Sequence, residues 1–139
     1  MTETLPAPRE RTDTLPLELP ERTLGYHAAA WMMDNLVQPN GPRAGQPFIP
    51  TDRQIEFLAH FYALNHKGGF MYRQGIRRLS KGSGKSPFAA ALCLFELLGP
   101  CRFDGFDRHE PFGVRAKPMS MPLVQIVATS ESQTANTIR

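Results

Sequence analysis

The chain has 139 residues, of which 41% are hydrophobic, and a formal net charge of +3. This length gives room for one ordinary domain with a modest core and no more. The two cysteines, Cys93 and Cys101, lack metal-type spacing, which argues against a zinc site and fits a reducing cytosol. No signal peptide and no apolar run near the roughly 18 residues that span a bilayer are visible. We therefore expect a protein that is not secreted and has no membrane partner.

Positive charge is concentrated in the middle of the chain. Between Glu56 and Glu96 there is no acidic residue, and the basic residues of this window are Lys67, Arg73, Arg77, Arg78, Lys81 and Lys85. Such a window produces a local positive field, and phosphate is its natural counter-charge. The distribution of charge thus favours a phosphate-bearing partner more strongly than the net charge does.

The first half of the chain predicts a tail and two helices. Residues 1–20 are rich in Pro, Thr and charge, so we expect a disordered tail, with the domain over 21–139. Apolar residues recur at helical spacing from Thr23 to Val37 and predict a helix. Thr51 and Gln54 match a capping box, in which each side chain satisfies a backbone donor at a helix start.

The second half alternates between strand-like and helix-like patterns. Residues 70–79 predict a strand or hairpin, and residues 87–98, apolar nearly all round, predict a buried helix. Residues 101–121 are typical of a surface loop or hairpin. The compact apolar run 123–128 favours a buried parallel strand, and a capping pattern at Ser130 predicts a further helix.

The sharpest motif is Gly84-Lys85-Ser86, which falls between a predicted strand and a predicted helix. Glycines let backbone amides turn toward phosphate oxygens, and a helix start adds its positive dipole end. Lys85 would reach the β- and γ-phosphates of a nucleotide, and the Ser86 hydroxyl would coordinate Mg²⁺. The full phosphate-loop pattern asks for a glycine where Leu79 stands. The other interpretation is therefore a Gly/Ser-rich basic turn that faces solvent.

These residues resemble a known family. The stretch Arg77–Phe88, which runs into an apolar helix, together with Gln125–Thr137 and Pro50–Gln54, is similar to the large subunit of tailed-phage terminases. The resemblance implies the N-terminal part of an α/β, RecA-like P-loop ATPase domain with a parallel sheet flanked by helices. It also implies a motor that packages double-stranded DNA with ATP and Mg²⁺ in the bacterial host cytoplasm. Its partners there would be the portal, the small terminase subunit and further copies in a ring.

Site residues are carried over by position. Lys85 and Ser86 would contact phosphate and Mg²⁺, with the loop residues Ser80, Gly82, Ser83 and Gly84 around the phosphates. Lys81 stands where the family often has an arginine that stabilises charge in the transition state, and lysine keeps the charge without the bidentate fork. Arg78 is a possible substitute for that arginine.

Gln54 has two interpretations that the sequence leaves open. It falls where many such ATPases use a glutamine to recognise adenine, and the capping box accounts for the same side chain without a ligand. Phe48 also has two interpretations. Its ring could pack on the base, or it could form an exposed hydrophobic contact before the helix.

The chain departs from the family in its second half. After Val127 no apolar strand ends in paired acids, and the nuclease carboxylates are missing. The domain is thus expected to be truncated before its acidic Mg²⁺-binding strand, through a shortened gene product or a split reading frame. Phosphoryl transfer needs several groups positioned at once, so we expect nucleotide binding with little or no hydrolysis.

Two other functions fit the same residues. A fragment of a P-loop kinase or helicase would share Lys85 and Ser86. The second is a basic DNA-binding or assembly module without ATPase activity. Its contacts with the nucleic-acid backbone would come from a cluster of basic side chains, namely Arg73, Arg77, Arg78 and Lys81. Its binding would fall steeply with salt and would be indifferent to ATP.

Overall fold

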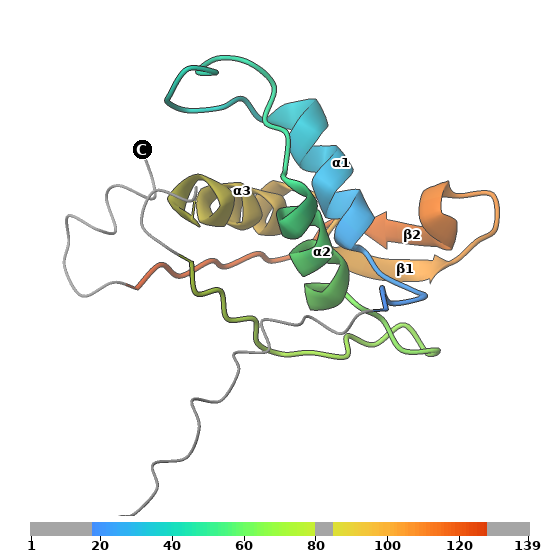
Figure 1. The fold of residues 1–139 in the computed structure, drawn as a ribbon. Coiled ribbons are helices and arrows are strands. Elements are labelled where there is room, and N and C mark those ends of the chain that lie inside the picture. The colour runs from blue at the N-terminus through green and yellow to red at the C-terminus, as the bar shows by residue number, and fades with distance from the viewer. Residues whose placement is uncertain (1–17, 80–84, 128–139) are drawn as a thin grey trace, which may run out of the picture.

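A computed structural model gives the fold and describes residues 18–79 and 85–127 (Figure 1). In chain order the elements are α1 (Gly25–Asn35), α2 (Asp52–Phe61), α3 (Lys85–Leu98), β1 (Arg102–Phe106), a short 3-10 turn (Pro111–Gly113) and β2 (Val114–Lys117). The three predicted helices in this part of the chain are confirmed. The predicted tail lies outside the described residues except for 18–20, and the helix predicted from Ser130 lies wholly outside them.

The start of α1 is joined to the end of α2. The Thr23 hydroxyl donates a hydrogen bond to the Ala59 carbonyl (2.6 Å) and accepts one from the Gly25 N–H (3.0 Å). Both backbone groups lie at helix ends, where they have no partner within their own helix. Gly25 allows the close approach, because a Cβ atom there would lie 2.3 Å from the Leu58 carbonyl oxygen.

The core lies between the three helices. Phe88, Ala91 and Phe95 form one stripe of α3 and are each at most 3% exposed. They share a cluster with apolar side chains of the other helices and the segments beside them, among them Leu24, Ala28, Met32, Phe48, Leu58 and Tyr62. The other side of α3 is open, with Leu97 38% and Leu98 68% exposed. The predicted buried helix is therefore buried along one face and exposed at Leu94, Leu97 and Leu98.

The second half of the chain contains the hairpin that was one of two predictions for residues 101–121. β1 and β2 pair antiparallel, from Arg102 opposite Lys117 to Phe106 opposite Val114. Nε2 of His27 on α1 donates a hydrogen bond to the Val114 carbonyl (2.8 Å). This bond attaches the hairpin to the side of the helical core (Figure 1).

The predicted parallel sheet is wrong. Within 18–79 and 85–127 the sheet is a two-stranded antiparallel hairpin, which contradicts the expected RecA-like fold of a parallel sheet flanked by helices. Residues 70–79 join no ladder apart from a single bridge between Leu64 and Phe70. The buried strand was expected over 123–128, of which residue 128 lies outside the described residues. Residues 123–127 pair with no other described segment, and Leu123 and Val127 are 81% and 91% exposed.

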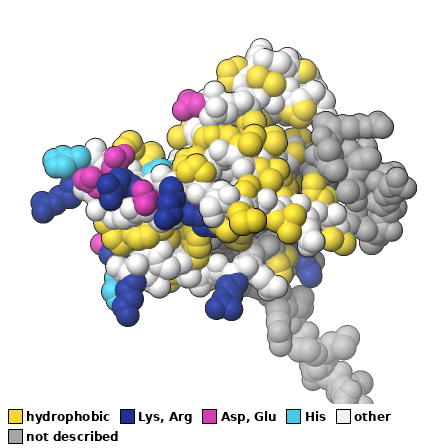
Figure 2. Space-filling model, turned by 180° about the vertical axis from the view of Figure 1, so that it is seen from behind, with side chains coloured by type: hydrophobic (Ala, Val, Ile, Leu, Met, Phe, Trp, Pro, Cys, Tyr) yellow, Lys and Arg dark blue, Asp and Glu magenta, His cyan; other side chains and the backbone are white. Residues whose placement is uncertain are grey.

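The physical reason lies in what a buried strand requires. An apolar run becomes a parallel strand only when neighbouring strands satisfy its backbone and helices cover both faces. Here Val124 and Ile126 are half-buried, and the other three described residues of the run, 123, 125 and 127, are exposed. Figure 2 shows hydrophobic side chains across the middle of the face seen there, with charged side chains at one end and along the lower edge.

None of the described helices is long and apolar enough to cross a membrane.

We predict that Gly25→Ala lowers the free energy of unfolding by about 2 kcal/mol, because the added methyl group would overlap the Leu58 carbonyl and push two helices apart. Urea denaturation followed by circular dichroism measures the change. Asp34→Ala, at the exposed end of the same helix, is the matched control and should change stability by less than about 0.5 kcal/mol. Equal stability of the two variants would contradict the close crossing of α1 and α2.

Candidate functional site

The Gly84-Lys85-Ser86 motif meets the start of α3. Lys85 is the first residue of the helix, and Ser86 is exposed in its first turn. The first turn carries no acidic residue, so its free N–H groups and positive dipole end have no counter-charge there. Phosphate is the kind of anion that such a helix start binds. The remaining residues of the predicted loop lie outside the described residues, namely Ser80, Lys81, Gly82, Ser83 and Gly84.

Arg77 fixes the segment that leads into this loop. Its guanidinium carbon lies 4.4 Å from the ring centroid of Phe88 on α3 and 5.2 Å from that of Phe57 on α2. Burial lowers the pKa of Arg77 from its ordinary value, but an arginine in a protein keeps its charge. The segment is thus held against both helices by cation–π contacts. Arg78, the next residue, is exposed.

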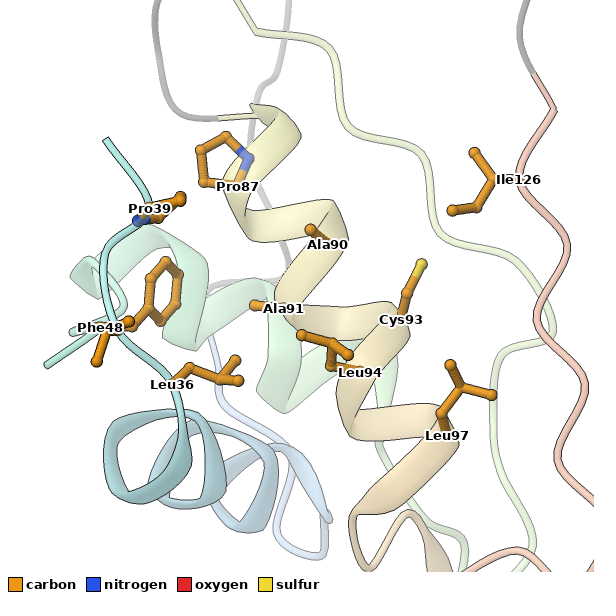
Figure 3. Close-up of a pocket in the computed structure, with 11 residues that line it drawn as sticks. Leu36, Pro39, Phe48, Pro87, Ala90, Ala91, Cys93, Leu94, Leu97 and Ile126 are labelled. Carbon is orange, nitrogen blue, oxygen red and sulfur yellow. The ribbon is translucent and has the colours of Figure 1, made fainter. Parts of the chain in front are cut away.

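An apolar pocket of about 250 Å³ lies along α3, where its lining extends from Pro87 to Leu97. In Figure 3, Pro39 and Phe48 face the side of the helix that carries Pro87. Phe48 is only 5% exposed, so its expected role as an exposed hydrophobic contact is wrong. Its placement brings an aromatic ring to the pocket wall near the candidate phosphate site. A pocket with this lining could accept the flat apolar face of a base.

Gln54 forms the predicted capping box. Its side-chain oxygen accepts a hydrogen bond from the Thr51 N–H (2.9 Å), and its own N–H donates to the Thr51 hydroxyl (3.2 Å). The Gln54 side chain is largely buried. The capping role is therefore confirmed, and α2 begins at Asp52 because of it. Recognition of adenine by Gln54 stays a prediction.

Metal binding at this site would depend on the nucleotide. The described residues include no group of three His, Cys, Asp or Glu side chains that could hold a metal ion. Burial, with a smaller contribution from Glu96, raises the pKa of the Cys93 and Cys101 thiols, so both stay protonated and are poor ligands near neutral pH. A magnesium ion at Ser86 would take its other ligands from phosphate oxygens and water.

Sequence reasoning missed a polar cluster at the other end of α3. The Tyr62 hydroxyl donates a hydrogen bond to one carboxylate oxygen of Glu96, and the Arg102 guanidinium lies 3.0 Å from the other. Burial, together with Glu96, raises the pKa of Tyr62, so its hydroxyl keeps its proton. The three residues follow no motif, because they come from the end of α2, from α3 and from β1.

The chain is similar to phage proteins that share the name Gene 13 protein. It is 38% identical to that of Mycobacterium phage L5 over 138 aligned residues, which cover 86% of this chain and 23% of the relative. It is 37% identical to that of Mycobacterium phage D29 over 136 residues, which cover 85% of this chain and 22% of the relative. The chain thus spans less than a quarter of the length of these relatives. No family model and no solved structure matches it.

For the capping box, we predict that Thr51→Ala lowers the free energy of unfolding by about 1 kcal/mol, because the first turn of α2 loses a hydrogen-bond acceptor. Gln54→Glu should be nearly neutral, since a carboxylate still accepts from the Thr51 N–H. Urea denaturation tests both, and a large loss in Gln54→Glu would contradict the observed cap. ATP titration of Gln54→Glu then separates the two roles, because glutamate keeps the cap and removes the amide donor.

For the stacked arginine, we predict that Arg77→Gln lowers the free energy of unfolding by about 1 kcal/mol, because two cation–π contacts are lost. Arg78→Gln removes the same charge from the neighbouring exposed position and should change stability by less than about 0.5 kcal/mol. Thermal unfolding at matched salt compares the two. If both variants lose the same stability, net charge and not stacking is responsible.

Proposed function

We propose that this chain binds a magnesium-bound nucleoside triphosphate, with the phosphates at the N-terminus of α3. The observation that carries the proposal is the coincidence of Gly84-Lys85-Ser86 with the start of a 14-residue helix whose first turn holds no acid. Phe88 is 1% exposed and anchors that turn in the core, so the N–H groups are preorganised for an anion.

Each residue has a separate role in this proposal. Lys85 contacts the β- and γ-phosphates, and the Ser86 hydroxyl takes one coordination position on Mg²⁺. Lys81 supplies a further positive charge as phosphoryl transfer proceeds, and the backbone of Ser80, Gly82, Ser83 and Gly84 surrounds the phosphates. The pocket wall formed by Phe48 and Pro87 receives the base, and Gln54 is retained as a possible adenine contact.

The larger function that we propose is that of a phage DNA-packaging motor of the terminase type. The sequence blocks around the phosphate loop support it, and the phage proteins to which the chain is similar are much longer than the chain. In this proposal the paired acids that complete hydrolysis belong to the longer protein, so this chain binds ATP and turns it over slowly. Double-stranded DNA, the portal, the small subunit and ring formation belong to the longer protein in the host cytoplasm.

One observation disfavours the alternative of a basic DNA-binding module. That module requires its arginines to face solvent, and Arg77 is stacked on Phe57 and Phe88 instead. Of the proposed cluster, Arg73 and Arg78 are the exposed members among the described residues. Two arginines can contribute to a phosphate-binding surface, but they form a smaller one than the sequence indicates.

We predict saturable, Mg²⁺-dependent binding of a fluorescent ATP analogue, and we expect this Mg²⁺-dependent component to be lost in Lys85→Ala. Lys67→Ala, which removes a lysine from the same acid-free window, is the matched control and should bind normally. Ser86→Ala should weaken binding about tenfold in Mg²⁺ and have little effect in its absence, because the hydroxyl acts through the metal. Mg²⁺-dependent binding that survives Lys85→Ala, or none by the folded chain, would contradict the proposal.

A further inference from the structure

A second cavity, of about 580 Å³, lies at the far end of α3. Its walls come from the end of α2, residues 70–73, α3, the start of β1 and Val124. Ser86 and Glu96 lie ten residues apart on one helix, which corresponds to about 15 Å. Glu96 is therefore well separated from the candidate phosphate contact at Ser86, whereas Cys93 lines both this cavity and the first pocket. The proposal for this cavity does not rest on the proposed function.

Aromatic rings form one side of the cavity. Phe61, Tyr62, Phe70 and Tyr72 all line it. Tyr62 is held in the core, whereas Phe70 and Tyr72 are 37% and 46% exposed. Exposed rings beside a cavity offer flat surfaces on which a planar ligand can stack.

The charged groups of the cavity are arranged for an anion. Glu96 is already neutralised, because it accepts a hydrogen bond from Tyr62 and pairs with Arg102. The same Arg102 guanidinium lies 5.8 Å from the Phe70 ring centroid, which holds the ring in place. Arg73 lines the cavity and is exposed, and no acid pairs with it among the residues that the structure describes. Two arginines and one carboxylate leave the lining with a net positive charge.

We propose that this cavity binds an unstacked nucleobase together with its adjoining phosphate. The base stacks on Phe70 and Tyr72, and the phosphate pairs with Arg73. Aromatic platforms next to arginines are the usual means by which proteins bind single-stranded nucleic acid without sequence preference. The shared chemistry of base and phosphate can come from a DNA single strand or from a free mononucleotide.

Fluorescence anisotropy with a labelled short oligothymidylate tests this proposal on the whole chain. Tyr72→Ala should weaken binding about tenfold, and Tyr72→Phe should bind as the native chain does, because stacking needs the ring and not the hydroxyl. Arg73→Gln should weaken binding and reduce the slope of log affinity against log salt by about 0.7, as expected for one lost phosphate contact on a single strand. Lys67→Gln is the control for charge alone.

The outcomes separate the ligand sources and the two sites. If thymidine monophosphate fully displaces the labelled oligomer, a mononucleotide is sufficient as the ligand. If only the unlabelled oligomer displaces it, the ligand is a single strand. Lys85→Ala should leave this binding unchanged, so loss of ATP binding does not imply loss of this site. The proposal is overturned if the chain does not bind the oligomer, if Tyr72→Ala binds as tightly as Tyr72→Phe, or if duplex of equal length binds as tightly as the single strand.

Discussion

The burial of one face of α3 is the constraint on which the rest of the structure depends. Phe88 and Phe95, 1% and 0% exposed, pack that face against the pair formed by α1 and α2. Because these two rings hold the helix in place, its N-terminus fixes where the Gly84-Lys85-Ser86 motif meets the fold, and Glu96 near its other end lines the second cavity. Arg77 adds to this arrangement, since it stacks on Phe88 and thereby ties the segment before the phosphate motif to the same buried turn.

Elements with local signals could be predicted from the sequence. Thr51 and Gln54 lie three residues apart and make the cap that they predict, so the start of α2 follows from side-chain chemistry alone. The helix predicted over residues 87–98 follows from a long apolar segment that ends at Gly99, and the observed helix begins two residues earlier, at Lys85. The hairpin over residues 101–121 was one of two alternatives, because turn residues without periodicity do not distinguish a loop from a short hairpin.

Features that depend on contacts between distant segments could not be predicted. Residues 123–127 carry the apolar pattern of a buried strand, but a pattern does not supply the neighbouring strands that such a strand needs. The stacking of Arg77 and the pairing of Glu96 with Tyr62 and Arg102 join residues from separate elements. In the sequence, Arg77 is one of several arginines in a basic window, and only the fold distinguishes the stacked residue from exposed Arg78.

The most direct measurement is an NMR titration of the isotopically labelled chain with ATP, with and without Mg²⁺. If the phosphates bind at the start of α3, saturable shift changes that appear only with Mg²⁺ should occur in the backbone amides of residues 82–86 and 88. If no Mg²⁺-dependent, saturable change occurs in these amides, ATP binding at the helix start is contradicted.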